Sequence, residues 1–200
     1  MGAASRGCPH LDDPYLTSPA VVGPEIYACG MTTEIKDALS QAAAYLREHR
    51  SEAKYTDSAA TAVLGDGLRV TVSGPGEASL TTDMPKSIGG RGDSPSPGWF
   101  LRAAPASCLA TLIGMEAARA GVVLRRVEVV VESESDDFGI LGIDESVPAG
   151  PLTSKASVRI ETEKPTDRTA LMAIADRHCP VTDAVRRAVP WTAELVEAKQ

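Results

Sequence analysis

Short stretches in which apolar and polar residues alternate predict β-strands in three parts of the chain. Gly-Asp-Gly (65–67) and Ser-Gly-Pro-Gly (73–76) separate the first three stretches, and both are typical turn sequences. The expected strands are 59–64, 68–72 and 78–82 in the first part, 127–131 and 156–161 in the second, and 189–195 near the end. The second pair should have one buried face, because its valines and isoleucine alternate mostly with polar side chains.

Three other segments repeat apolar residues every three or four positions and predict helices. Residues 31–54 carry one such stripe, and we expect an N-terminal helix there. Residues 99–120 are apolar nearly all round, which is typical of a helix in the middle of a domain or in an interface. Residues 166–188 form the third segment, which Cys179-Pro180 interrupts. The order of strands, helix, strands, helices and strand predicts an α+β domain over residues 55–200, not an alternating doubly wound fold.

Pro105 lies inside the most helical of these segments. A proline in a helix interior removes a backbone hydrogen bond and costs about 3 kcal/mol, whereas the first turn tolerates it. We therefore expect a short turn at 98–103, followed by a long helix with Pro105 in its first turn. Cys108 then lies near the start of that helix.

Composition and charge narrow the class of protein. Hydrophobic residues make up 43% of the 200 residues, which is enough for a core, and the net charge of −7 argues against a nucleic-acid surface. No window of about 20 residues is continuously apolar, so we expect a cytoplasmic protein without a membrane span. Residues 1–30 are rich in Gly, Pro, Ser and Ala and lack a signal-peptide pattern. We expect them to be a disordered N-terminal extension, with a lid over the domain as the alternative.

Four cysteines carry the clearest chemical potential. Cys8, Cys29, Cys108 and Cys179 are too few for a disulfide scaffold, and the three histidines form no ligand cluster with them, so we expect no metal and no cofactor. The last two are both expected at helix starts, where unpaired N–H groups lower the pKa of a thiol. A cysteine in an apolar helix is more often a packing residue, so position alone leaves a redox pair and a packing role open.

Two motifs around these cysteines resemble those of the OsmC/Ohr family. Residues 94–108 read SPSPGWFLRAAPASC and are similar to its first-cysteine motif, which runs from a proline through small residues into a long helix. Residues 176–182 read DRHCPVT and are similar to its second-cysteine motif, whose core is Cys-Pro-Val-Ser/Thr. The similarity runs in order over roughly residues 55–197.

This resemblance implies a fold, an assembly and a reaction. It implies antiparallel sheets around a long central helix, in an intertwined homodimer with two sites at the subunit interface. It also implies that an organic hydroperoxide oxidises Cys108 to a sulfenic acid, which Cys179 resolves as a disulfide. An external dithiol, such as a dihydrolipoyl group, then reduces the disulfide.

The resemblance leaves two points open. Peroxidase members usually have a proline eleven residues before the first cysteine and a Glu directly after that proline. The Glu helps hold an arginine against the thiolate. In this chain the proline is Pro97, and Gly98 stands in place of the Glu. No motif assigns the arginine, and we choose Arg91, in the loop before the helix, over Arg69 and Arg102; a solvated loop charge is the alternative. The alternative function is a protein without peroxidase turnover that binds a small apolar ligand or senses oxidants at the interface pocket.

Overall fold

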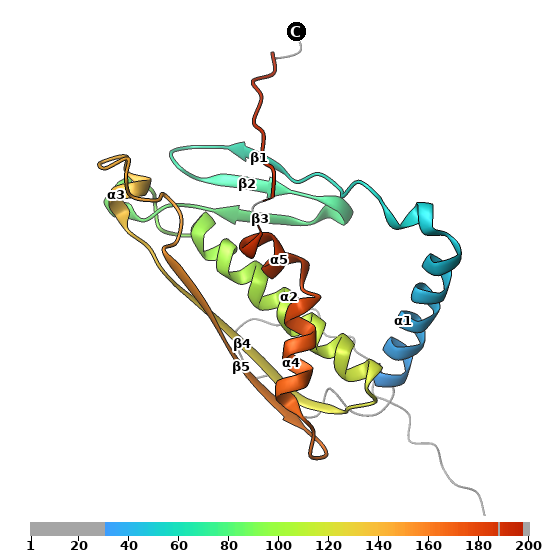
Figure 1. The fold of residues 1–200 in the computed structure, drawn as a ribbon. Helices are drawn as coiled ribbons and strands as arrows, with labels where there is room; N and C mark the ends of the chain where they lie inside the picture. The colour runs from blue at the N-terminus through green and yellow to red at the C-terminus, as the bar shows by residue number, and fades with distance from the viewer. Residues whose placement is uncertain (1–30, 188, 198–200) are drawn as a thin grey trace, which may run out of the picture.

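The chain forms a mixed α/β structure with two antiparallel sheets (Figure 1). The computed structural model describes residues 31–187 and 189–197, so the expected extension at 1–30, with Cys8 and Cys29, lies outside the described residues. The helices are α1 (Met31–Glu48), α2 (Pro97–Arg119), α3 (Asp137–Ile140), α4 (Arg168–Arg177) and α5 (Pro180–Arg186), with 3-10 turns η1 (Arg50–Ala53), η2 (Pro75–Glu77) and η3 (Lys86–Ile88). The strands are β1 (Thr61–Leu64), β2 (Val70–Ser73), β3 (Ser79–Thr82), β4 (Leu124–Glu134) and β5 (Thr153–Thr162).

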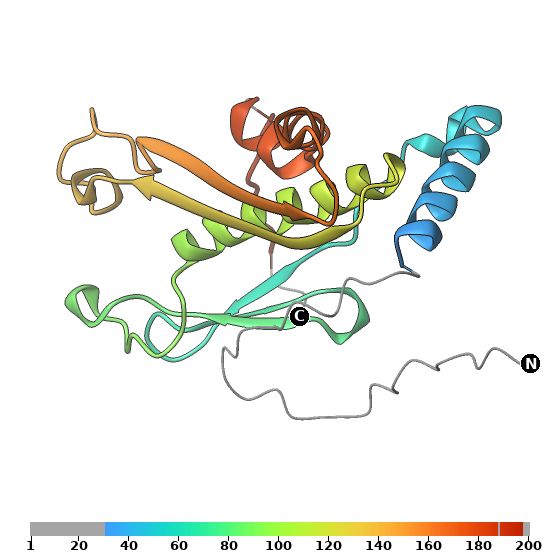
Figure 2. The ribbon, with the colours of Figure 1, turned by 90° about the horizontal axis from the view of Figure 1, so that it is seen from below.

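The first three strands form a sheet of their own, which lies apart from the β4–β5 hairpin (Figure 2). Both pairings are antiparallel, with Leu64 opposite Val70 at one end of the first pair. Gly67 in the β1–β2 turn has a φ of 64°, a left-handed conformation that glycine adopts without strain. Every residue of β1 is exposed, and Val63 and Leu64 are each 63% exposed. The described residues therefore leave the apolar side chains of this strand uncovered.

β4 and β5 form a long antiparallel hairpin that packs on α2. Val127 pairs with Ile160 and Val129 with Val158 across the hairpin. Ile160 and Leu124 are buried, and the three valines are half-buried against the same cluster. The alternation that predicted one buried face for these strands is confirmed.

α2 is one continuous helix of 23 residues, so the predicted break before Pro105 is wrong. Ser96 caps the helix by accepting a backbone N–H at 3.2 Å, and Pro97 occupies the first turn. These two residues provide the start signal that we had assigned to Pro105. Burial of the Pro105 ring offsets the one backbone hydrogen bond that it removes. Cys108 consequently lies in the helix interior and not in its first turn.

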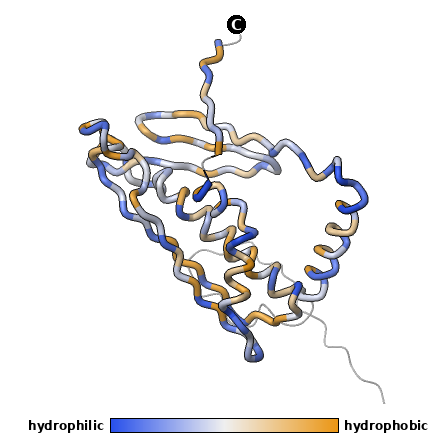
Figure 3. Tube along the Cα trace, in the orientation of Figure 1, coloured by the Kyte–Doolittle hydropathy of each residue, from blue (hydrophilic) through white to orange (hydrophobic). Residues whose placement is uncertain are grey.

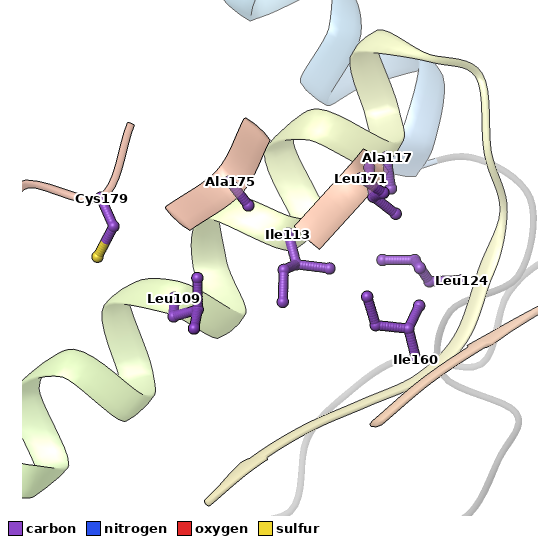
Figure 4. Packing of buried hydrophobic residues seen from close by; sticks show 8 residues of the cluster. All are labelled: Leu109, Ile113, Ala117, Leu124, Ile160, Leu171, Ala175 and Cys179. Carbon is purple, nitrogen blue, oxygen red and sulfur yellow. The ribbon is translucent and has the colours of Figure 1, made fainter. Parts of the chain in front are cut away.

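The core lies where α2 meets the β4–β5 hairpin and α4 (Figure 4). Ile113 and Ala117 are fully buried at its centre. On α4, Leu171 and Ala175 are buried, whereas Ile174 is 40% exposed. The buried members are Leu109, Ile113, Ala117, Leu124, Ile160, Leu171, Ala175 and Cys179.

α1 packs against α2 and extends the structure on the N-terminal side (Figure 1). Ile35, Leu39 and Ala43 are half-buried on one stripe of the helix, as the helical period predicts. None of the described helices is both long enough and apolar enough to cross a membrane.

Residues 189–197 form no strand, so the strand predicted at 189–195 is wrong for this chain on its own. Trp191 is 89% exposed and Leu195 is fully exposed. The alternating pattern is present, and apolar residues recur along this segment and β1, away from the core (Figure 3). A strand also needs a neighbour for its backbone N–H and C=O groups, and none of the described strands pairs with this segment.

Candidate functional site

Packing between helices brings the two cysteines together. Cys108 lies in the interior of α2, and Cys179 lies between α4 and α5. Cys179 takes the capping position of α5 and Pro180 its first helical position, as the sequence predicts. Because α2 packs against both α4 and α5, residues that are 71 positions apart in the sequence meet at this junction.

The two thiols are close enough to shift each other's pKa, and neither cysteine is in a disulfide. Cys179 has no exposed surface, whereas Cys108 is half-buried. Figure 4 shows the Cys179 sulfur directed toward the part of α2 that carries Leu109, the residue after Cys108. Solvent therefore reaches one member of the pair, Cys108.

The start of α5 makes Cys179 the more acidic thiol of the two. Burial by itself raises the pKa of Cys179. The Thr182 amide and hydroxyl, the Cys108 thiol and the Val181 amide all hydrogen-bond to its sulfur, and together they hold the pKa of Cys179 below its usual value. The expectation that a helix start lowers the pKa of this thiol agrees with the structure.

The same expectation is wrong for Cys108. Burial raises the pKa of the Cys108 thiol, and the hydrogen bond to Cys179 raises it further. The Val181 amide lowers the pKa, but not enough to reverse the shift. The physical reason is the continuous helix, since the N–H groups in the interior of α2 already bond within the helix.

The structure has a polar turn next to Cys179 that we did not predict from the sequence. The Thr182 hydroxyl lies within hydrogen-bonding distance of the Cys179 and Asp176 carbonyl oxygens, at 3.2 and 3.3 Å. Arg186 donates to both carboxylate oxygens of Asp176, at 2.9 and 2.7 Å. These contacts fix the α4–α5 junction that holds the buried thiol. The sequence signal for this turn was Thr182, the threonine of the Cys-Pro-Val-Thr motif.

A buried carboxylate on α2 contacts the other side of this junction. Glu116 is 8% exposed and accepts hydrogen bonds from Arg119, one turn away, and from His178 Nδ1 at 3.3 Å. His178 directly precedes Cys179 and ends α4. In the sequence, Glu116 is the single acidic residue of the apolar segment 108–118. That isolated charge was the one sequence signal for a buried carboxylate, and we did not predict the contact from it.

Arg91 lies in an ordered loop between β3 and α2, but the structure does not bring it into contact with the thiols. Its guanidinium is largely exposed and lies 3.9 Å from Asp66. Asp83, which is 1% exposed, anchors the loop by accepting the Arg91 and Gly92 backbone N–H groups at 3.0 and 3.1 Å. Gly90 is required there, because a Cβ would overlap the Met84 carbonyl. Whether Arg91 binds a substrate stays a prediction.

The site offers the chemistry of a thiol pair. Two thiols close enough to shift each other's pKa can be joined by a disulfide after a small movement. Within the part of the chain that the structure describes, no cluster of three or more His, Cys, Asp or Glu residues could hold a metal ion.

Comparison with solved structures shows the fold. An OsmC like protein from Mycoplasma pneumoniae is 14% identical, with a TM-score of 0.57 over 68% of this chain and 91% of that chain. An OsmC-like protein of unknown function from Vibrio cholerae is 11% identical, with a TM-score of 0.54 over 65% and 94%. An organic hydroperoxide resistance protein from Elizabethkingia anophelis is 16% identical, with a TM-score of 0.50 over 68% and 91%.

Comparison with family models shows the family. No curated protein matches the chain at a significant level. The family described as OsmC-like protein matches residues 90–194, a range that includes α2, the β4–β5 hairpin and both cysteines. The family predicted from the two cysteine motifs is thus confirmed, and the chain belongs to the OsmC-like protein family.

Proposed function

We propose that this protein is a thiol-dependent peroxidase that reduces organic hydroperoxides through Cys108 and Cys179. The observation that carries the proposal is the contact between a half-exposed thiol and a fully buried one. Such a pair separates the two steps of peroxide reduction, because the exposed sulfur meets the oxidant and the buried sulfur meets only its partner. The name of the Elizabethkingia anophelis protein, organic hydroperoxide resistance protein, supports the substrate class.

The reaction has three steps. The Cys108 thiolate attacks one oxygen of the O–O bond, the sulfur is oxidised to a sulfenic acid, and the alkoxide leaves. The Cys179 thiolate then attacks the Cys108 sulfur, forms the disulfide and displaces hydroxide, which takes up a proton to become water. An external dithiol, such as a dihydrolipoyl group, reduces the disulfide, restores both thiols and is itself oxidised.

The two thiols differ in how readily they ionise. The raised pKa of Cys108 makes the loss of its proton to solvent a cost of the first step, and the departing alkoxide takes up a proton to become the alcohol. The lowered pKa of Cys179 favours the thiolate that attacks the sulfenic acid in the second step.

The assembly in this proposal is an intertwined homodimer around the α2 helices. Apolar side chains of β1 are uncovered, and residues 189–197 expose Trp191 and Leu195 without a strand neighbour. A second copy supplies both a cover and a pairing edge. Light scattering at micromolar concentration should therefore give twice the mass of the chain, and a monomer would contradict this assembly.

Two further assignments belong to the proposal. Arg91 binds the peroxide or its product at the dimer interface, which requires a second copy because its guanidinium does not contact the thiols of its own chain. The protein works in the cytoplasm, since each turnover consumes a dithiol and thiol reductants are maintained there.

Gly98 favours a second candidate function. It lies in the first turn of α2, where the peroxidases of the family usually carry a Glu, and a Cβ at this position would meet the Ser96 hydroxyl at 3.7 Å. In this second function the protein, without that carboxylate, binds a small apolar ligand or senses oxidants with no catalytic turnover, and one assay decides between the two functions.

The deciding assay follows the consumption of cumene hydroperoxide by the full chain in the presence of a dithiol. Wild type should turn over many equivalents, and Cys108→Ser should consume none above background. Cys179→Ser should react once and stop at a sulfenic or sulfinic acid on Cys108. If wild type stops after one equivalent or never reacts, the peroxidase proposal is wrong and the second candidate takes its place.

Peptide mapping after one equivalent of peroxide tests the roles of the two thiols. Wild type should contain an intrachain bond between Cys108 and Cys179. In Cys108→Ser, Cys179 should stay largely reduced, because it has no exposed surface. Capture of the oxidation by Cys8 or Cys29 instead would contradict the two-cysteine mechanism.

A further inference from the structure

A groove of about 420 Å³ lies between the first half of α2, the β4–β5 hairpin and α5. Its volume falls within the range of small-molecule pockets. Neither cysteine lines the groove, but Thr182 does, and Thr182 hydrogen-bonds to Cys179. The groove is therefore a separate feature that shares three wall residues, Asp176, Thr182 and Arg186, with the junction that holds the buried thiol.

Most of the groove is apolar. Leu101, Pro105 and Leu109 of α2 form one side, and Val131 and Ala156 of the hairpin form the other. Such walls accept an aliphatic chain or a small ring and give little affinity to a fully polar molecule.

Two arginines line this groove, and their surroundings differ. Arg186 is neutralised by Asp176, to which it donates two hydrogen bonds of 2.9 and 2.7 Å. Arg102 is half-buried and donates to the Ser133 hydroxyl at 3.2 Å, a neutral partner. Among the described residues, no carboxylate lies within 4 Å of the Arg102 guanidinium.

A half-buried cation beside apolar walls is poorly solvated and favours an anionic partner. The guanidinium presents a fork of N–H donors that matches the two oxygens of a carboxylate, and Ser133 occupies only part of it. The groove thus combines an anion-binding group with apolar walls.

We propose that this groove binds a small amphipathic carboxylate, with Arg102 holding the carboxylate and the apolar walls holding the aliphatic part. The proposal goes beyond the peroxidase function and does not depend on it, because no thiol takes part in the binding. It makes Arg102, and not Arg91, the anion-binding residue of the single protomer.

The test is calorimetric titration of the reduced full chain with octanoate and, separately, with octan-1-ol. Octanoate should bind at least about tenfold more tightly than the alcohol, since a hydrogen bond to a charged group contributes that much. Arg102→Gln should weaken octanoate binding by a similar factor. Arg126→Gln is the matched control, because Arg126 is exposed on β4, pairs with Glu128 and does not line the groove; it should bind like wild type.

A second variant keeps the charge and fills the space. Ala156→Leu should weaken octanoate and octan-1-ol alike, even if Arg102→Gln fails to fold. Equal affinity for acid and alcohol, unchanged binding in both groove variants, or no binding of octanoate at millimolar concentration would each overturn the proposal. These measurements need no peroxide, so their failure is distinct from a failure of the peroxidase function.

Discussion

The buried Glu116 on α2 is expected to couple helix packing to the position of Cys179. It contacts Arg119 on its own helix and His178 at the end of α4, and Cys179 follows His178 directly. Glu116→Gln removes the charge while keeping the size and one acceptor oxygen. We expect the folded protein to lose stability and the α4–α5 junction to become less well fixed.

The magnitude follows from burial. The Glu116 side chain is 9% exposed, whereas Arg119 and His178 are 44% and 53% exposed. A hydrogen bond to a charged group contributes about 1.5–3 kcal/mol when buried, and an exposed ion pair contributes about 0–1 kcal/mol. Because the donors are half in solvent and the amide keeps one acceptor, the total for both contacts should be about 1–2 kcal/mol.

Urea unfolding at fixed protein concentration measures this loss. Glu128→Gln is the matched control, since Glu128 also contacts two arginines but is 38% exposed on β4. Its cost should stay below about 0.5 kcal/mol. A double-mutant cycle with His178→Ala separates the contact across the junction from the contact within α2.

Two results would refute the reasoning. Equal losses for Glu116→Gln and Glu128→Gln would mean that burial does not strengthen the Glu116 contacts. A coupling energy near zero between Glu116 and His178 would mean that this contact does not hold the junction. If the coupling is present, the disulfide between Cys108 and Cys179 should also form more slowly in Glu116→Gln under a limiting dose of peroxide.

Three other predictions concern the core, the loop before α2 and the thiol pair. Ile113→Ala should cost about 2–5 kcal/mol because Ile113 is fully buried, whereas Ile174→Ala on the exposed side of α4 should cost about 1 kcal/mol or less, both by urea unfolding. Burial raises the pKa of Asp83, but four backbone N–H groups outweigh it and hold the pKa below its usual value. Its stabilisation is therefore present above the unfolded pKa of about 3.9 and is lost as the pH falls through the folded value. Asp83→Asn should lower Tm by several degrees at pH 7 and flatten its decline in acid. Cys179→Ser should speed alkylation of Cys108 by iodoacetamide at neutral pH, because Cys179 helps raise the pKa of Cys108; slower alkylation would contradict this.

Local sequence patterns predicted the elements whose partners lie within the same chain. The alternating valines of β4 and isoleucine of β5 face α2, and the turn sequences before residue 79 separate the first three strands. The pattern at 189–195 is equally regular, yet it forms no strand. Alternation specifies which side chains share a face, but only a neighbouring strand satisfies the backbone, and a single sequence does not reveal that neighbour.

The candidate site could be predicted in part for a similar reason. Cys179 was placed correctly at a helix start, because Pro180 is a local signal for the first helical position. Cys108 was misplaced, because Pro105 was read as a start while Ser96-Pro97 had the stronger capping signal. The Glu116 contacts join distant segments and have no local signature.

Cys179 is the more acidic of the two thiols, whereas Cys108 is the one that solvent reaches. This difference determines which step of the reaction each cysteine can carry out. Cys179 has the lowered pKa but no exposed surface, so its thiolate cannot meet a peroxide from solvent. Cys108 has access but a raised pKa. The proposed reaction uses both properties, because the accessible sulfur of Cys108 meets the peroxide and the more acidic Cys179 supplies the thiolate that resolves the sulfenic acid. The raised pKa of Cys108 slows the first step, so removing the neighbour that raises it should make Cys108 more reactive toward the first equivalent of peroxide.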